Sequence, residues 1–257
     1  MKEKIKLVKN LLEKRSARRK EGLFVVEGPH LVEEAIRSGA KIKFVVSTHP
    51  QREIEEIEVI KVSRKQFAEL SEVRSPQGIL AVVKMPECKL GDLLGRAGIK
   101  PAPTFGCPLI VYCLGVQDPG NLGTIIRSAD AFGASGVILS KGTVDLYNPK
   151  VVRSTMGSLF HLPIVITEDD QATINYLKEN KVKLLATEMK TKQAVNSVDL
   201  KGPVTVLVGN EGAGLSEEIL KQADETVSIP MAGQAESLNV GMATTVVLYE
   251  ALRQRIE

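Results

Sequence analysis

The chain is poor in the residue types that mark several large classes of protein. Its 257 residues include three cysteines, three histidines, no tryptophan and only 4% aromatic residues. Cys88, Cys107 and Cys113 form no C-x-x-C pair, and the histidines lie far from them in the sequence, so no zinc-binding spacing exists. We therefore expect no metal. An odd number of cysteines, one of them inside an apolar run, predicts reduced thiols and a reducing compartment.

Long apolar runs and two common nucleotide-binding motifs are also absent. No apolar run approaches the roughly twenty residues of a membrane-spanning helix, and the charged amino terminus is unlike a signal peptide. We expect a cytoplasmic protein with no membrane partner. The segment 115–120 lacks the Lys-Ser/Thr of a Walker loop, and G-x-G-x-x-G does not follow any predicted strand. The histidines His30, His49 and His161 are interpreted as capping or surface residues.

Positive charge is concentrated at the amino terminus. The net charge is only +3, but residues 1–21 contain nine Lys or Arg and three Glu, so the remaining chain is slightly acidic. Two interpretations stay open, a solvated face of an amphipathic helix and a foothold for nucleic-acid phosphates. The basic residues nearest the first predicted strand, which would contact phosphates, are Arg15, Arg18, Arg19 and Lys20.

Strand and helix patterns alternate along the chain in two series. Residues 1–86 form a small amino-terminal α/β domain with predicted strands at 22–27, 43–47, 58–62 and 78–85 and helices at 30–37 and 64–72. Residues 87–107 form a proline- and glycine-rich linker.

The second series occupies residues 108–257. Its predicted strands are 109–114, 136–139, 183–186 and 204–208, and its predicted helices include 124–132 and 238–253. Near-continuous apolar strands of this kind are typical of a parallel sheet buried on both faces. The fold class is therefore α/β, with a parallel sheet and helices on both of its faces.

Three segments of the second domain each close a strand and open a helix. They are Asn121-Leu-Gly-Thr-Ile-Ile-Arg127, Gly209-Asn-Glu-Gly-Ala-Gly214 and the segment Ile229 to Ala243. Ligands of α/β domains bind at the carboxyl ends of strands, so three such loops predict one site. In the first segment we expect Asn121 and Arg127 both to face the strand ends. Taken alone, Asn121 as a helix cap and Arg127 in a surface ion pair would be the simpler interpretation.

These three segments resemble, in order and spacing, the signature motifs of the SpoU (TrmH-type) family of S-adenosylmethionine-dependent RNA 2′-O-methyltransferases. Residues 24–28 and 75–83 look like the small substrate-binding domain that many members carry. The resemblance implies S-adenosylmethionine as cofactor, structured RNA as partner and a carboxy-terminal trefoil knot that builds the cofactor pocket. It also implies a homodimer through the last helix, in which Val246, Leu248 and Leu252 would be partly buried between protomers.

The resemblance assigns roles to individual positions. The residues implied in catalysis are Arg127, Asn121, Glu211, Ser237 and Asn239. The residues implied in cofactor binding are Gly209, Ile229, Leu238 and Met231. Apart from the resemblance, Thr187 and Glu188 directly follow the predicted strand 183–186 and are further candidates for the rim of the pocket. The arginine is either a phosphate clamp or a general base. A free arginine titrates near pH 13, so neutralising it at pH 7 costs about 8 kcal/mol, which favours the clamp.

One position departs from the family pattern, and several functions stay open. Members usually have serine where this chain has Gly241, which puts fine substrate contacts in doubt. The separate amino-terminal domain favours ribosomal RNA of the large subunit as substrate, with transfer RNA as the alternative. A nonenzymatic RNA-binding assembly factor and a nucleotide-dependent oxidoreductase are the rivals from other classes. The intact Arg127 and Glu211 argue against the first rival, and the missing phosphate fingerprint argues against the second.

Overall fold

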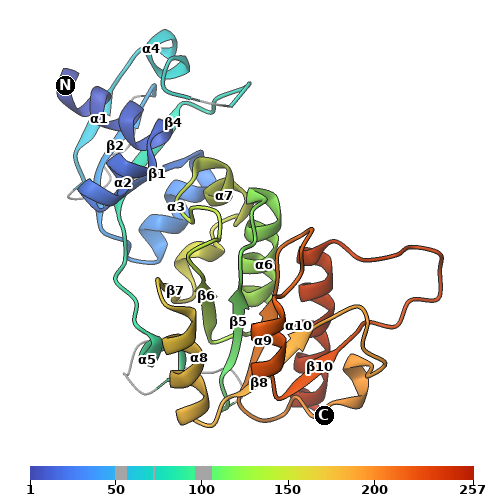
Figure 1. Cartoon of the computed structure of the whole chain (residues 1–257). Coiled ribbons are helices and arrows are strands. Elements are labelled where there is room, and N and C mark those ends of the chain that lie inside the picture. The colour runs from blue at the N-terminus through green and yellow to red at the C-terminus, as the bar shows by residue number, and fades with distance from the viewer. Residues whose placement is uncertain (50–56, 72, 96–105) are drawn as a thin grey trace. The chain divides into compact units, whose positions relative to one another are not determined.

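The chain divides into two compact units, drawn in Figure 1. The computed structural model describes residues 1–49, 57–71, 73–95 and 106–257. The amino-terminal unit contains Met1–Glu87 and Asp145–Phe160, and the carboxy-terminal unit contains Cys88–Val144 and His161–Glu257. The sequence had suggested a division after residue 86, and it had placed 145–160 in the second domain. Residues 96–105 of the predicted linker, and residue 72 at the end of a predicted helix, lie outside the described residues.

The amino-terminal unit is built on a four-stranded sheet of order β1-β4-β2-β3. Its strands are β1 (Leu23–Glu27), β2 (Ile42–Ser47), β3 (Val59–Lys61) and β4 (Ile79–Lys84). Its helices are α1 (Lys2–Glu13), α2 (Arg15–Glu21), α3 (Pro29–Arg37), α4 (Arg64–Ala68) and α7 (Pro149–Ser154). Strand β4 pairs antiparallel with both β1 and β2, and β3 pairs parallel with β2. The apolar stripe of α1 packs on one face of this sheet, with Val8 and Leu11 fully buried in its core.

The segment Asp145–Phe160 supplies aromatic side chains to the opposite face of β1. The ring of Phe24 lies 4.6 Å from that of Tyr147 and 6.2 Å from that of Phe160, measured between centroids. Alternate residues of a strand point to opposite faces, so Phe24 turns away from the α1 side while Leu23 and Val25 face it. No local pattern in the sequence indicates this pairing of distant segments.

A buried ion pair also links this segment to α2. The side chain of Arg18 is 4% exposed and that of Asp145 is 13% exposed. The Arg18 guanidinium donates to Asp145 Oδ2 at 2.6 and 3.0 Å and to the carbonyl oxygens of Leu11 and Leu12 at 2.6 and 3.1 Å. The expectation that Arg18 contacts RNA phosphates is therefore wrong, because burial and these bonds occupy its donors.

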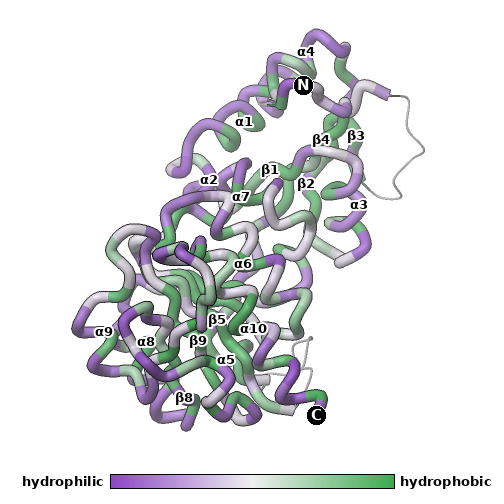
Figure 2. The backbone as a smooth tube through the Cα atoms, turned by 90° about the vertical axis from the view of Figure 1, so that its right-hand side faces the viewer, coloured by the Kyte–Doolittle hydropathy of each residue, from purple (hydrophilic) through white to green (hydrophobic). Residues whose placement is uncertain are grey.

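The carboxy-terminal unit contains a six-stranded sheet of order β10-β8-β9-β5-β6-β7 in which every pair is parallel. Its strands are β5 (Leu109–Cys113), β6 (Gly136–Leu139), β7 (Ile164–Ile166), β8 (Lys183–Thr187), β9 (Val204–Val208) and β10 (Glu225–Val227). Figure 2 shows β5 and β9 as hydrophobic segments in the interior of this unit. The strands β7 and β10, of three residues each, were not predicted.

Helices cover both faces of this sheet, as the sequence predicted. The helices of the unit are α5 (Leu90–Leu93), α6 (Pro119–Ala131), α8 (Asp170–Glu179), α9 (Glu217–Gln222) and α10 (Val240–Ile256). Residues of α5, α8 and α9 pack into one core with alternate residues of the strands, whereas α6 packs against α10 on the other face. Leu93 is fully buried there, so part of the predicted linker belongs to the core. In the described part of the chain, no helix is both long and apolar enough to cross a membrane.

The strand order brings two distant loops together. Strand β5 has β6 on one side and β9 on the other, so the chain reverses its direction of sheet growth at β5. Such a switch point opens a crevice at the carboxyl ends of the two strands concerned. The loops that follow β5 and β9 therefore meet, although they are about ninety residues apart, as the 94-residue separation of Gln117 and Glu211 shows.

The Arg18–Asp145 pair predicts unequal costs for two substitutions. Asp145→Ala leaves the buried Arg18 without its counter-ion, and breaking a buried pair in this way costs about 3–5 kcal/mol of unfolding free energy. Arg15→Ala removes a half-exposed cation 3.9 Å from the same carboxylate, and it should cost under about 1 kcal/mol. Urea unfolding of both variants measures the difference. Equal losses would contradict a structural role for the pair.

Candidate active site

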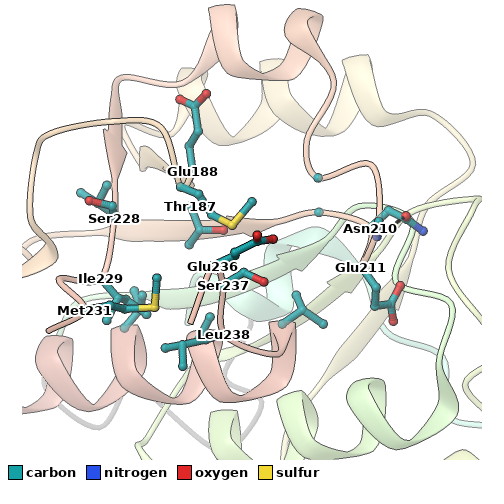
Figure 3. A pocket seen from close by; sticks show the side chains of 18 residues that line it. Thr187, Glu188, Asn210, Glu211, Ser228, Ile229, Met231, Glu236, Ser237 and Leu238 are labelled. Carbon is teal, nitrogen blue, oxygen red and sulfur yellow. Dashed lines mark hydrogen bonds between the residues drawn. The ribbon is translucent and has the colours of Figure 1, made fainter. Parts of the chain in front are cut away.

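A pocket lies at the carboxyl ends of β8, β9 and β10, beside the first turns of α10 (Figure 3). All six residues predicted to bind the cofactor line it, namely Thr187, Glu188, Gly209, Ile229, Met231 and Leu238. Glu211 and Ser237 from the predicted catalytic set also line it. The cavity measures about 200 Å³, below the roughly 300–1,000 Å³ of pockets that enclose a drug-sized ligand, so part of a bound molecule would remain exposed to solvent.

The lining combines an apolar interior with carboxylates. Val227 and Val247 are buried, Ile229 is half-buried, and Leu238 is 41% exposed at the mouth. The two acidic side chains besides Glu211 are Glu188 and Glu236. Apolar surface suits the flat face of an adenine, and negative charge suits a cationic ligand. These residues therefore fit S-adenosylmethionine, which carries both an adenosine and a sulfonium.

The loop after β9 is held in shape by its own backbone. A Cβ on Gly209 would collide with the backbone of Gly214 and Leu215, so glycine is required there for loop closure. Asn210 donates its side-chain amide to Gly115 O at 3.0 Å, and its Oδ1 accepts from the backbone N–H groups of Gly212 and Ala213. The tight turn, more than close approach of a ligand, explains Gly209.

Glu211 lies at the centre of a hydrogen-bond network that connects the three motif segments. Its carboxylate accepts from Asp118 N at 2.9 Å, from Gln117 N at 3.1 and 3.2 Å, and from Asn121 Nδ2 at 3.0 Å. Burial alone would raise the pKa of Glu211, but the bonds from the Asn121 amide and from the two backbone donors outweigh it. They hold the pKa of this carboxyl below its ordinary value of 4.5, so Glu211 is ionised at neutral pH.

Asn121 links this hydrogen-bond network to the third motif. Its Oδ1 accepts a hydrogen bond from Asn239 Nδ2 at 2.8 Å, while its Nδ2 donates to the Glu211 carboxylate. Asn239 Oδ1 in turn accepts from Gly241 N and Met242 N, which makes Asn239 the N-cap of α10. The chain Glu211–Asn121–Asn239 therefore fixes one residue from each motif relative to the others. Ser237 lines the pocket and does not cap this helix.

Arg127 is not brought together with these residues. Helix α6 begins at Pro119, with Asp118 as its N-cap, and not at residue 124. Asn121 is thus inside the first turn and is not the cap. Six helical residues correspond to about 9 Å along the axis and about 240° around it, so Asn121 and Arg127 point in different directions. Arg127 is exposed and does not line the pocket, and the described residues include no hydrogen-bond or ion-pair partner for it.

The structure explains the glycine at 241. A Cβ there would lie 3.1 Å from both Cβ and Cγ2 of Thr124, which is tighter than ordinary packing. Helices α6 and α10 approach closely at this point, and Ser128 and Thr245 share a 2.7 Å hydrogen bond nearby. Glycine at 241 on α10 therefore leaves room for the β-branched side chain of Thr124 on α6.

Comparison with known proteins identifies the family. Residues 108–249, more than half of the chain, match the model of the SpoU rRNA methylase family. The chain belongs to this family. Residues 2–81 match the MRM3-like substrate binding domain. The family predicted from the three motifs is confirmed, and with it an S-adenosylmethionine-dependent RNA ribose methyltransferase. The fold prediction is confirmed as a parallel α/β sheet with helices.

Named relatives resemble the chain over nearly its whole length. The 23S rRNA (guanosine(2553)-2′-O)-methyltransferase RlmP of Bacillus subtilis is 35% identical, with 96% of this chain and 95% of the relative covered. The 23S rRNA (uridine(2479)-2′-O)-methyltransferase of Streptomyces viridochromogenes is also 35% identical, with 96% and 88% covered. The crystal structure of the SpoU methyltransferase AviRb from Streptomyces viridochromogenes in complex with AdoMet superimposes with a TM-score of 0.87 at 33% identity, covering 99% and 98% of the two chains.

Sequence reasoning missed several lining residues of the pocket. Val240, Ala243 and Val247 line it from α10 at positions i, i+3 and i+7, a spacing that indicates one helix face. Asn210 and Glu236 lie directly beside predicted residues and had a signal only in that adjacency. Ser228 and Met189 follow the ends of β10 and β8, and they too lie directly beside predicted residues, Ile229 and Glu188.

The Glu211 network predicts a pH-dependent contribution to stability. Glu211→Gln replaces an acceptor oxygen with a donor, so one of the three donors loses its acceptor. We expect a loss of about 1 kcal/mol at neutral pH, because the site is partly exposed. The lowered pKa means that the wild-type advantage is complete above pH 4.5 and is lost as the pH falls through the lower folded-state value.

Urea unfolding of wild type and Glu211→Gln between pH 3 and pH 7 measures this difference, with the exposed Glu179→Gln as matched control. A difference that persists unchanged at the lowest pH would show that the carboxylate charge is not responsible.

Proposed function

We propose that the protein methylates a ribose 2′-hydroxyl of large-subunit ribosomal RNA with S-adenosylmethionine as donor. The observation that carries the proposal is the network Glu211–Asn121–Asn239, which joins all three motif segments beside an apolar pocket with acidic walls. The named relatives that cover almost the whole chain act on 23S ribosomal RNA, which supports this substrate over transfer RNA.

The donor would supply a methyl group on a positively charged sulfur, and the protein's own residues would hold and orient the reactants. Ile229, Leu238 and Val247 offer apolar contact for the adenosine, and the turn at Gly209 and the end of β8 form the walls. Alignment of donor and acceptor is the main contribution a protein can make to such a transfer. The rigid Asn210 turn and the capped α10 keep this alignment fixed.

Glu211 is unsuited to remove the proton from the ribose hydroxyl. Its oxygens already accept three donors, and its lowered pKa makes it a weak base. We assign Glu211 and Asn121 to positioning, and Asn239 and Ser237 to the rim where the ribose would enter. Arg127 acts first as a clamp for an RNA phosphate, since its guanidinium is exposed and cationic, and only second as a base.

The amino-terminal unit would hold the RNA. Arg15, Arg19 and Lys20 are exposed on α2 and are proposed to contact phosphates, whereas Arg18 is excluded by its burial. A ribosomal RNA substrate also implies the compartment where ribosomes assemble, for which we propose the cytoplasm.

We further propose the trefoil knot of the family for the carboxy-terminal unit. The end of α10 is tied to distant segments. Arg255 donates to the carbonyl oxygens of Leu200, Gly202, Cys107 and Pro108, and Gln254 bonds Leu200 N and Val198 O. Burial lowers the pKa of Arg255 from its ordinary value. These bonds support a helix that returns past the loop before β9 and the start of β5.

A labelled methyl group tests the activity. Wild-type protein incubated with methyl-labelled S-adenosylmethionine and unmodified 23S ribosomal RNA should place label in an alkali-resistant dinucleotide, because a 2′-O-methyl group blocks alkaline cleavage. Arg127→Ala should reduce kcat/KM at least about 100-fold, the loss expected when a clamp for a reacting group is removed. The exposed Lys178→Ala on α8 is the control.

Binding of S-adenosylmethionine without incorporation into 23S ribosomal RNA, and label in transfer RNA instead, would exclude the proposed substrate. Cofactor binding with no incorporation into any RNA would favour a nonenzymatic RNA-binding protein.

A homodimer through α10 is proposed with a corrected set of contacts. Leu248, expected at the interface, is fully buried within its own chain. Besides Ile256 at its end, the exposed large apolar side chains on α10 are Met242 (60%), Val246 (39%) and Tyr249 (55%), and these three share one helix face. Tyr249 also meets Phe132 at the end of α6, with ring centroids 5.9 Å apart.

Charge placed on this face should disrupt the dimer. We expect wild-type protein to sediment as a dimer at micromolar concentration and Val246→Glu to sediment as a monomer, because association would bury an unpaired carboxylate. Ala172→Glu, which adds the same charge at an exposed position of α8, far from α10 in sequence, should stay dimeric. A wild-type monomer, or a dimeric Val246→Glu, would rule out this face.

A further inference from the structure

A second cavity lies in the amino-terminal unit, at the end of β2, the start of α4 and the turn before β4. Its volume is about 470 Å³, within the roughly 300–1,000 Å³ typical of ligand sites. Four polar side chains line it, from Thr48, His49, Arg64 and Gln77, together with the apolar residues Phe67, Ala68 and Pro76. None of these residues belongs to the methyl-transfer pocket.

The walls of this cavity are fixed by local bonds. Thr48 donates its backbone N–H to Gly78 O at 2.8 Å and its hydroxyl to the same oxygen at 3.3 Å. Gly78 has φ +76°, and a Cβ there would collide with the Thr48 hydroxyl, so the two walls meet closely. A capping box between Ser63 and Gln66 fixes the start of α4, where Arg64 follows directly. The cavity is therefore formed before any ligand binds.

The lining has the chemistry of a nucleotide site. Arg64 is an exposed cation, and within the described residues no ion pair occupies it. The Gln77 amide both donates and accepts hydrogen bonds, as the polar edge of a nucleobase does. Pro76 is half-buried and provides apolar surface for the face of a base, and the exposed His49 ring offers a flat partner for stacking, whereas Phe67 is buried in the core of the unit. Proteins read single-stranded RNA through this combination of stacking, edge hydrogen bonds and phosphate contact.

The cavity also differs from the basic surface of α2. Arg15, Arg19 and Lys20 present charge without a concave surface, which suits sequence-independent contact with phosphates. A cavity with an amide and an apolar floor would instead select an unpaired base, since a base inside a duplex cannot enter it.

We propose that this cavity binds one extrahelical nucleotide of the RNA substrate, with Arg64 on its phosphate, Gln77 on the base edge and the base packed against Pro76 and the His49 ring. The identification of RNA as the ligand rests on the proposed function. The site gives the amino-terminal unit a recognition element of its own, distinct from the nucleotide that receives the methyl group.

The test compares two RNA hairpins that differ by one nucleotide. Fluorescence anisotropy with the full chain measures Kd for a hairpin with a single extrahelical nucleotide and for the same hairpin fully paired, with each of the four bases at the extrahelical position. Stacking of one base on protein side chains changes affinity about 5- to 150-fold, so wild type should prefer at least one bulged hairpin about tenfold or more. Arg64→Ala and Gln77→Ala should each remove most of that preference.

Matched controls exclude general electrostatics. Lys65→Ala removes the neighbouring cation on α4, and Arg74→Ala removes a cation from the adjacent turn; both residues are exposed, and neither lines the cavity. Both variants should keep the preference for the bulged hairpin. Equal loss in Lys65→Ala and Arg64→Ala, or equal wild-type binding of all hairpins, would overturn the proposal. Free nucleoside monophosphates binding as tightly as the hairpin would also overturn it, in favour of a small-molecule site.

Two variants distinguish failure of nucleotide binding at this cavity from failure of the proposed methyl transfer. Arg127→Ala should reduce kcat/KM for methyl transfer at least about 100-fold and leave the hairpin preference unchanged, whereas Arg64→Ala should raise KM for RNA with kcat and S-adenosylmethionine binding preserved. A protein that prefers the bulged hairpin without methylating RNA would retain this site and lose the proposed function. A protein that methylates RNA without any preference for the bulged hairpin would keep the proposed function and exclude this nucleotide site.

Discussion

The candidate active site depends on the carboxylate of Glu211. This side chain follows β9, and its three donors come from the segment after β5 and from the first turn of α6. An ionised carboxylate that accepts several N–H groups forms stronger hydrogen bonds than a neutral acceptor would. Asn121 also accepts a hydrogen bond from Asn239, and Asn239 accepts one from the backbone at the start of α10, so the network extends from Glu211 to this helix. The position of one carboxylate thus fixes the start of the last helix, and with it one wall of the pocket.

This bond exists only because the sheet reverses at β5. Strands β5 and β9 are neighbours with β6 on the far side, so two loops about ninety residues apart end in one crevice. The parallel order also puts the ends of β8 and β10 beside that crevice, where Thr187 and Ile229 line the pocket. The topology supplies the convergence, and the motif residues supply the chemistry.

Those features of this arrangement that depend on short stretches of sequence could be predicted. The buried strands β5, β6, β8 and β9 were predictable because each is a nearly continuous apolar run, and the pocket-lining residues Gly209, Ile229 and Leu238 were predictable from the motifs. The start of α6 also had a local signal, Asp118 followed by Pro119. The prediction missed this signal and began the helix at residue 124. Other features had no local signal. Arg18 has the same charge as Arg15 and Arg19, and only its distance of 2.6 Å to Asp145, 127 residues away, distinguishes a buried ion pair from a phosphate contact.

The geometry of α6 separates two tasks within a single motif. Asn121 lies in the first turn and is committed to Glu211 and Asn239, while Arg127 lies about 9 Å further along the axis and points elsewhere. A phosphate held by Arg127 would therefore lie outside the pocket lined by Gly209 and Leu238. If both act on one nucleotide, the RNA must extend along α6, with its backbone at the exposed face and its ribose turned toward the crevice. The six-residue spacing of the motif then measures the offset between the phosphate contact and the reacting ribose, and a change in that spacing would move one without the other.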